Sequence, residues 1–217
     1  MRSIAELRGL RFPDMYVIRM LFKEGLQRTQ GSVLELGCGS GNNLLPFADF
    51  GWEVTGLDIS AEALADARHN LTGAGRLIEC DLATEFPLPE DELFDAILLP
   101  NIIYYLPRRS LIRVLHECGR RIRPNGVLFL SARTREDWRC GRGVEEEPGG
   151  YRLDCRETGE FGLLNVFYDA KELGALVRDH FGELKSPVRL FATCDNPQGG
   201  IVVRNADVVI WGRAVGS

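Results

Sequence analysis

The sequence predicts an α/β fold with a mostly parallel sheet, and three observations lead to it. Short apolar runs alternate with stretches of helical periodicity, which requires crossover connections between parallel strands. Two final apolar runs are joined by turn residues and form a hairpin, which adds an antiparallel strand. The chain has 217 residues without repeats or low-complexity linkers, so residues 1–217 are expected to form a single domain.

The expected strands are short runs in which apolar residues prevail. The segment RPNG turns the chain into the fifth strand, and CDNPQGG joins the last two strands. In chain order the runs cover residues 33–36, 53–57, 76–80, 94–99, 127–131, 184–193 and 206–214.

The helices between these strands are indicated by apolar spacing and by capping residues. We expect a helix over 42–50, a second with Ser60 as its N-cap, and a third with Pro107 in its first turn. Asp169 and Glu172 form a capping signal for a further helix. Two apolar stripes support the last two helices: Leu111, Val114, Leu115, Cys118 and Ile122 in one, and Leu173, Leu176 and Val177 in the other.

Two segments stand outside this alternation. Residues 1–30 contain an expected helix near 16–26 and are interpreted as an N-terminal helical cap. Residues 133–168 are long, polar and rich in glycine, and they precede the penultimate helix of the predicted order. A connection of this length in a compact domain is usually functional, so we interpret it as a lid or insert. A disordered surface loop is the alternative.

Composition and charge argue against several classes of protein. A net charge of -5 disfavours a nucleic-acid partner, because such partners require clustered basic surface. No apolar run is long enough to span a membrane, and the N-terminus lacks the features of a signal peptide, so a cytoplasmic location is expected. The six cysteines lack metal-ligand spacing, so no metal site is expected; Cys38, Cys80 and Cys118 read as core residues.

The stretch VLELGCGSGNN carries the strongest functional signal. Gly37, Gly39 and Gly41 follow the first strand and precede a helix, where glycine permits a tight turn and close approach of the backbone to a ligand. A purely structural turn is the alternative. Asp58 and Asp81 end the next two strands, where carboxylates can accept from ribose hydroxyls and from an exocyclic amine. Together these residues predict a nucleoside site.

The spacing and the acid beside the loop narrow the choice of cofactor. The dinucleotide fingerprint is G-x-G-x-x-G, whereas this loop reads G-x-G-x-G. Glu35 would repel a pyrophosphate but would attract an ammonium or a sulfonium group. Glycine N–H groups and a carboxylate can together hold an amino-acid zwitterion. This combination predicts S-adenosylmethionine.

An ordered set of motifs resembles one known family. VLELGCGSG, VTGLDIS, ECDL, FDAILLPNIIYYL and RPNGVLFLS are similar to the successive motifs of class I S-adenosylmethionine-dependent methyltransferases, and they cover about residues 32–132. The resemblance implies a Rossmann-like, doubly wound sheet of seven strands with an antiparallel last strand. It also implies methyl transfer from S-adenosylmethionine, with S-adenosylhomocysteine as product.

The resemblance also implies roles for the residues that bind the cofactor. Glu35 and the loop would hold the methionine part, Asp58 the ribose, and Asp81 the edge of the adenine. A contact from Asn43 competes with a role in starting the helix. Phe12 or Tyr16 would reach the cofactor from the N-terminal segment, and a helix that only packs against the sheet is the alternative for this segment. The full expected set is Tyr16, Glu35, Gly37, Cys38, Gly39, Gly41, Asn43, Asp58, Ile59, Asp81, Leu82 and Pro100.

The acceptor site is less well defined. Asn101, Tyr104 and Tyr105 follow the fourth strand and are candidates for catalysis, although PNIIYY departs from the N-P-P-Y-like motif of some amino-group methyltransferases. All three histidines fall in expected helices, so no histidine base is assigned. Methyl transfer is an in-line displacement that depends mainly on proximity and desolvation. The candidates for binding the acceptor are Arg133, Arg135, Trp138, Asn165 and Tyr168.

Two other functions compete with a methyltransferase that acts on a small molecule. A nicotinamide-dependent oxidoreductase has a related sheet, but the loop spacing and Glu35 count against it. A non-catalytic protein that binds S-adenosylmethionine would keep the loop and lack an acceptor pocket. The sequence does not indicate the acceptor or the oligomeric state.

Overall fold

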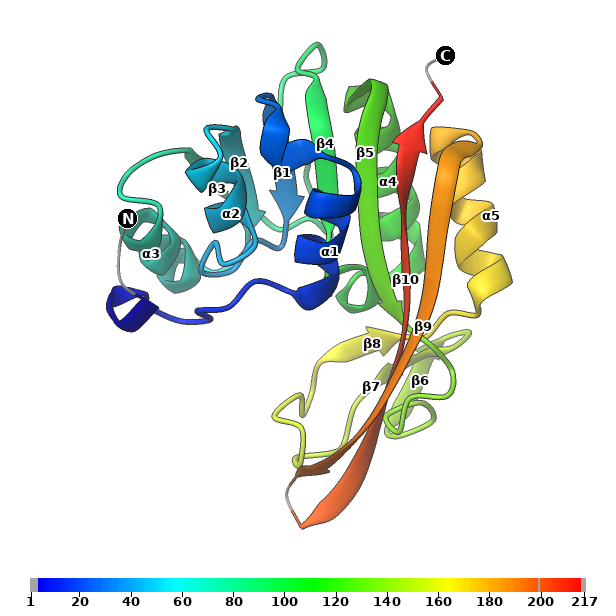
Figure 1. Ribbon diagram of the computed structural model, residues 1–217. Coiled ribbons are helices and arrows are strands. Elements are labelled where there is room, and N and C mark those ends of the chain that lie inside the picture. Colours follow the sequence, from blue (N-terminus) through cyan, green and yellow to red (C-terminus); the bar gives the residue numbers. More distant parts are fainter. Residues whose placement is uncertain (1–3, 199, 216–217) are drawn as a thin grey trace.

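The computed structural model describes residues 4–198 and 200–215, and its main feature is the expected α/β sheet (Figure 1). Within these residues a seven-stranded sheet has the order β3-β2-β1-β4-β5-β10-β9. Strands β1 to β5 run parallel, whereas β10 runs antiparallel to both of its neighbours. The bounds are β1 Ser32–Leu36, β2 Glu53–Asp58, β3 Arg76–Glu79, β4 Phe94–Leu99, β5 Ile122–Arg133, β9 Leu184–Gln198 and β10 Ile201–Ala214.

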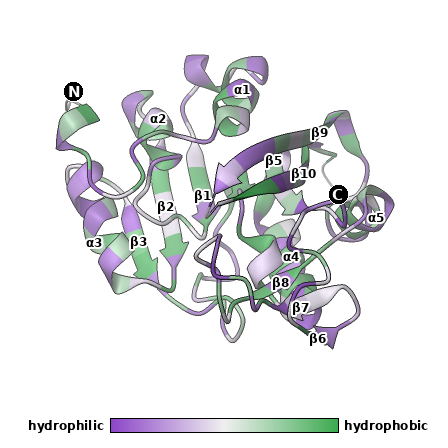
Figure 2. Cartoon of the chain, turned by 90° about the horizontal axis from the view of Figure 1, so that it is seen from below, coloured by the Kyte–Doolittle hydropathy of each residue, from purple (hydrophilic) through white to green (hydrophobic). Residues whose placement is uncertain are grey.

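Helices cover both faces of this sheet, which confirms the doubly wound arrangement. One core cluster packs α1, α2 and α3 on one face, and a second packs α4 and α5 on the other. Figure 2 looks from below along the strands and shows α1 and α2 on one side of them and α4 on the opposite side. The helices are α1 Met15–Lys23, α2 Leu44–Asp49, α3 Ala61–Asn70, α4 Arg108–Arg121 and α5 Ala170–Phe181, with short 3₁₀ turns η1 Ile4–Glu6, η2 Leu26–Arg28 and η3 Ile103–Tyr105.

The capping residues act largely as expected. The Ser60 hydroxyl accepts from the Ala63 N–H at 3.2 Å, and the Asp169 carboxylate accepts from the Glu172 N–H at 2.7 Å. Pro107 is the N-cap of α4 rather than a residue of its first turn. The predicted insert precedes α5, which is the last helix of the described chain and not the penultimate one.

Several predicted boundaries move, and in the strands they move because long-range pairing overrides local pattern. The first helix of the sheet region begins only at Leu44. Strand β5 already begins at Ile122, which ends the predicted α4 stripe, and residues 123–126 lie at a register shift opposite β4. The final hairpin is longer than predicted, because pairing continues from the sheet to the Gln198–Ile201 pair. Much of CDNPQGG is therefore strand rather than turn.

The insert at 133–168 is an ordered unit. It contains the three-stranded sheet β6-β7-β8, formed by Val144–Glu147, Gly150–Arg152 and Leu164–Val166. In Figure 1 this small sheet lies beside the projecting part of the β9–β10 hairpin, below the carboxyl ends of the parallel strands. Its position agrees with the predicted lid, and the role of a lid stays a prediction.

The remaining expectations concern cysteines and membranes. All six cysteines are free, and Cys38, Cys80 and Cys118 are buried as predicted. No helix among the described residues combines the length and the apolar character needed to cross a membrane. Residues 1–3 of the predicted N-terminal cap and residues 216–217 of the predicted domain lie outside the described residues.

Candidate active site

The glycine loop adopts a backbone that only glycine accommodates without strain. Gly37, Gly39 and Gly41 have φ angles of 70°, 51° and 75°, in the left-handed region. The N–H groups of Gly37 and Cys38 donate to the Leu57 carbonyl at 2.7 and 3.0 Å, which docks the start of the loop on β2. The loop therefore follows directly from its glycine spacing.

The space beside the backbone is filled at Gly37 and empty at Gly39. A Cβ atom at Gly37 would lie 2.8 Å from the Ile102 side chain, whereas a Cβ atom at Gly39 would meet no atom within 4 Å. The backbone at Gly39 thus faces open space at the carboxyl edge of the sheet. This is the place where a ligand can approach the main chain closely.

We predict that Gly37→Ala destabilises the protein by about 3 kcal/mol, the sum of left-handed strain and overpacking against Ile102. Gly39→Ala has the same strain without the contact, so it should cost only about 1 kcal/mol. Urea unfolding of both variants at one pH measures the two values. Equal losses of stability would show that the contact with Ile102 relaxes at no cost.

Asp58 is tied to the loop and remains able to accept further hydrogen bonds. Its Oδ2 accepts from the Gly39 N–H at 2.8 Å, and its Oδ1 accepts from the Ser60 N–H at 2.9 Å. Each carboxylate oxygen can accept more than one bond, so ligand hydroxyls can still be held. The next residue, Ile59, is 67% exposed and presents apolar surface beside Asp58; its predicted contact with the cofactor stays a prediction.

The residues expected at the adenine edge are partly engaged in local structure. The Asp81 carboxylate accepts from the Ala83 N–H at 2.8 Å and so closes a turn. The Leu82 side chain is buried in the core, and its backbone carbonyl accepts from the Arg113 guanidinium at 2.8 Å. Cys38 and Pro100 are also buried. Their predicted contacts with the cofactor stay predictions.

Glu35 is the most unusual residue of the site. It is 1% exposed, and its Oε1 accepts from the Asn43 side-chain amide at 2.7 Å. Its Oε2 is buried without a hydrogen-bond partner among the described residues. Burial raises the pKa of this carboxyl group to about 8, the bond from Asn43 opposes the rise, and the charges of Asp58 and Asp14 add to it. Asn43 therefore orients Glu35 and does not cap α2 with its side chain.

Asp14 connects this carboxyl group to the end of β4. Its N–H donates to the Asn43 side-chain oxygen at 2.7 Å, and its Oδ2 accepts from the Asn101 side-chain amide at 3.2 Å. Asn101 has a left-handed φ of 56°, and its N–H donates to the Ser131 hydroxyl at 2.9 Å. A continuous set of hydrogen bonds thus links Glu35 on β1 to Ser131 on β5.

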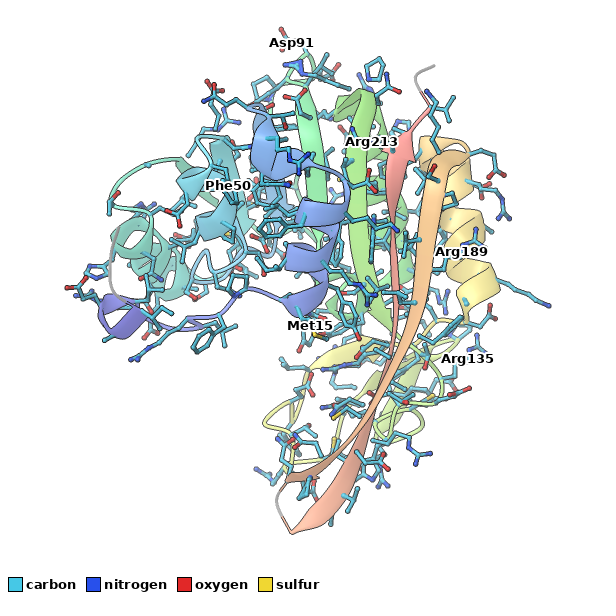
Figure 3. All side chains as sticks on the ribbon, viewed as in Figure 1. Met15, Phe50, Asp91, Arg135, Arg189 and Arg213 are labelled. Carbon is cyan, nitrogen blue, oxygen red and sulfur yellow. The ribbon has the colours of Figure 1, made fainter. Side chains whose placement is uncertain are left out.

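The N-terminal segment crosses the glycine loop, and its predicted contact with the cofactor stays a prediction. The Ser40 hydroxyl donates to the Leu10 carbonyl at 3.0 Å, and the Asn42 amide donates to the Phe12 carbonyl at 2.9 Å. Phe12 is 68% exposed, and Tyr16 packs partly against the core under α1. Figure 3 shows Met15, the first residue of α1, at the lower end of that helix, near the carboxyl edge of the sheet.

The predicted acceptor residues lie in different parts of the structure. Some of them belong to a buried charged cluster. The Arg133 guanidinium lies 4.2 Å from the centre of the Tyr104 ring and donates to Glu160 at 2.6 Å. Tyr105 donates to the same Glu160 carboxylate at 2.7 Å. The cluster comprises Tyr104, Tyr105, Arg133, Asp137, Arg139, Glu160 and Asn165.

The cluster limits what its members can do. Arg133 already binds Glu160 and Asn165, so it is not a free site for an acidic acceptor. Burial raises the pKa of both Tyr104 and Tyr105, so both phenols keep their protons at neutral pH. These two tyrosines can orient an acceptor, but they are poor bases.

The other predicted acceptor residues lie elsewhere. Arg135 and Tyr168 line a cavity of about 150 Å³ beside the start of α5. Trp138 lines another cavity of about 290 Å³, where the Arg142 guanidinium stacks 3.6 Å from the centre of its ring. In Figure 3 Arg135 lies on one side of the hairpin, and Met15, the first residue of α1, lies on the other. The structure therefore does not bring the five candidates into one pocket.

Several site residues escaped the sequence reasoning. Asp14 precedes an amphipathic run and follows a proline, so it could have been identified as an N-cap but not as a partner of Asn101. Ser131 and Glu160 carry no sequence signal. Asp207 lies opposite Arg133 in the sheet, and burial raises its pKa to about 6. No cluster of His, Cys, Asp or Glu in the described parts of the chain could hold a metal ion.

The fold and the loop define a nucleoside-binding α/β domain with its site at the carboxyl edge of the parallel strands. A family model described as a methyltransferase domain matches residues 33–126. The chain belongs to the class I S-adenosylmethionine-dependent methyltransferase family, whose cofactor is S-adenosylmethionine.

Individual relatives agree with this family. A malonyl-[acyl-carrier protein] O-methyltransferase from Enterobacter lignolyticus is 31% identical over 60% of this chain and 55% of its own length. An uncharacterised protein from Haemophilus influenzae is 33% identical over 66% of this chain and 68% of its own length. The chain thus spans about half to two thirds of these two relatives. A solved S-adenosylmethionine-dependent methyltransferase from Methanosarcina mazei has a TM-score of 0.72 at 20% identity, covering 95% of this chain and 100% of that one.

Proposed function

We propose that this protein transfers a methyl group from S-adenosylmethionine to a small-molecule acceptor. The observation that carries the proposal is the buried Glu35 Oε2, which has no partner among the described residues, beside the open backbone at Gly39. A buried carboxylate without a counter-charge is costly, and an ammonium group of a ligand would satisfy it. Glu35 therefore fits the amino-acid part of this cofactor.

The chain's own residues would bind and orient the reactants. When bound, S-adenosylmethionine supplies a methyl group activated by its sulfonium. Glu35 would hold the ammonium, the Gly39 region would give the close approach, and Asp58 would accept from the ribose hydroxyls. The N-terminal segment, held by Ser40 and Asn42, would keep water from the loop.

The acceptor side supports a reaction driven by positioning. Asn101 is fixed by Asp14 and Ser131 at the end of β4, and in Figure 1 the insert lies below the carboxyl ends of the parallel strands. Protonated tyrosines give hydrogen-bonding groups without a base, which agrees with proximity and desolvation as the main catalytic effects. The Enterobacter relative is named for an acceptor on an acyl-carrier protein, so a carrier-bound small molecule is included in the proposal.

Calorimetric titration with S-adenosylmethionine, S-adenosylhomocysteine and NADH tests the cofactor. We predict that both adenosyl ligands bind and that Asp58→Ala weakens each by about 2 kcal/mol, the value of hydrogen bonds to a charged group. Asp49→Ala, at the exposed end of α2, is the control and should bind normally. Binding of NADH alone would instead favour the oxidoreductase.

A second measurement separates an enzyme from a protein that only binds the cofactor. The purified protein is incubated with methyl-labelled S-adenosylmethionine and pools of small molecules, and product formation is followed by mass spectrometry. Transfer of label to an acceptor, lost in Asp58→Ala, supports the enzyme. Tight binding without transfer to any pool would favour the non-catalytic protein.

A further inference from the structure

We propose that Asp14 is a positioning residue that couples closure of the N-terminal segment to the cofactor-binding carboxylate of Glu35 and to Asn101 on the acceptor side. The inference rests on the proposed function. Asp14 lies outside every motif of the family match, which covers residues 33–126. Its place in the site follows only from its contacts.

The contact toward the cofactor side runs through one side chain. The Asn43 amide donates to Glu35 at 2.7 Å, and its oxygen accepts from the Asp14 N–H at 2.7 Å. Asn43 is 6% exposed; its bond to Glu35 is buried, and the bond that it accepts from Asp14 is partly buried. An asparagine with both ends engaged cannot rotate freely, and the position of Asp14 therefore sets the orientation of Glu35.

The contact toward the acceptor side uses the carboxylate itself. Asp14 Oδ1 caps α1 by accepting from the Tyr16 N–H at 2.7 Å, and its Oδ2 accepts from Asn101 at 3.2 Å. Asn101 holds a left-handed backbone conformation that is costly for a residue other than glycine. The bonds that Asn101 makes with Asp14 and Ser131 offset that cost and fix its side chain beside the end of β4.

Closure of the segment is part of the same arrangement. Residues 8–14 cross the loop through bonds from Ser40, Asn42 and Asn70 to backbone carbonyls. The last bond of this series is the one between Asp14 and Asn43. When the segment lifts, Asn43 loses one of its two partners and Glu35 loses its fixed orientation. A closed segment and an ordered cofactor carboxylate therefore occur together.

The charge of Asp14 gives the coupling a measurable signature. Burial raises the pKa of Glu35, and the charges of Asp58 and Asp14 raise it further, while Asn43 lowers it. The charge of Glu35 also acts on the Cys38 thiol, whose pKa burial raises well above neutral pH. A bound ammonium favours the charged carboxylate, so binding near neutral pH should release a proton from Glu35.

A matched pair of helix-capping aspartates tests the proposal. Asp14 and Asp169 each cap a helix through one carboxylate oxygen, but Asp169 caps α5 away from the glycine loop. The variants are Asp14→Ala, Asp14→Asn and Asp169→Ala. Titration with S-adenosylhomocysteine at pH 7, in buffers of different ionisation enthalpy, gives the affinity and the number of protons released.

The expected results separate positioning from capping. Asp14→Ala should bind about tenfold more weakly, in line with the loss of one partly buried charged hydrogen-bonding group. Asp14→Asn keeps a capping oxygen, so it should bind better than the alanine variant and release fewer protons than the wild type, because Glu35 loses a neighbouring negative charge. Asp169→Ala should match the wild type in both readouts.

Two outcomes would overturn the inference. If Asp14→Ala and Asp169→Ala bind with equal affinity and equal proton release, Asp14 is only a cap. If proton release is unchanged in Asp14→Asn, its charge does not reach Glu35. Failure of the wild type to bind S-adenosylhomocysteine would count against the proposed function as well, so the two failures remain distinguishable.

Discussion

Glu35→Gln will stabilise the free protein at alkaline pH and weaken its binding of S-adenosylhomocysteine. The pKa of Glu35 rises from its ordinary value of 4.5 to about 8, mainly through burial. Between these values the folded state keeps a proton that the unfolded state has lost, so stability falls as pH rises. This loss of folding stability is absent below pH 4.5 and complete above pH 8. At about 1.4 kcal/mol per unit of pKa, it amounts to about 4–5 kcal/mol.

Thermal unfolding at pH 5 and at pH 8.5 checks this prediction. Glutamine cannot titrate and can still accept from Asn43, so the variant should match the wild type at pH 5 and exceed it at pH 8.5. In the ligand titration it should bind about tenfold to a hundredfold more weakly, because the counter-charge for the ammonium is gone. Glu53→Gln, at the exposed start of β2, should change neither quantity. A variant that is no more stable than the wild type at pH 8.5 would contradict the raised pKa.

Glu160→Ala will lower the free energy of unfolding by about 3–5 kcal/mol, the usual cost of removing one partner of a buried ion pair. Glu160 is 8% exposed and accepts from Arg133 at 2.6 Å, Arg139 at 2.5 Å and Tyr105 at 2.7 Å. Without it, two buried guanidinium groups lose a counter-charge. The loss should be read by urea unfolding at pH 7.

Acid unfolding and two further variants test the contribution of Glu160 to stability. Burial raises the pKa of Glu160, but the two arginines and Tyr105 outweigh it, and the net shift is downward. Its contribution is therefore present above its ordinary pKa and is lost as pH falls through the lower folded-state value. Glu160→Gln should cost less than the alanine variant, and Glu157→Ala, an exposed acid in the same segment, should cost nearly nothing. A loss below 1 kcal/mol for Glu160→Ala would show that water or rotation satisfies both arginines.

The parts of the fold that the sequence predicted are those fixed by local pattern. Apolar runs placed the strands of the main sheet, and Ser60 and Asp169 marked helix starts, because capping depends on neighbours a few residues away. The glycine spacing likewise predicted the loop. Strand ends were predicted less well: β5 and the hairpin extend further because their pairing partners, far along the chain, continue to supply hydrogen bonds.

The parts that escaped prediction depend on side chains that meet only in the folded chain. Asp14 and Asn101 are separated by 87 positions, and Arg133 and Glu160 by 27. Arg133 follows a predicted strand, and the sequence makes it a candidate for binding the acceptor. The buried Glu160 removes that option, and no periodicity or motif could have revealed it.

The placement of β10 affects how the chain folds while it is being synthesised. This strand lies between β5 and β9, although β9 precedes it in the chain. Before residue 201 leaves the ribosome, the edge of β5 that later pairs with β10 has no partner strand. Phe129 on β5 also lacks its contact with Trp211, whose ring stacks 6.3 Å from it in the folded protein. An unpaired apolar edge invites pairing with other chains. We therefore expect the nascent protein to be more prone to aggregation until its β10 residues emerge.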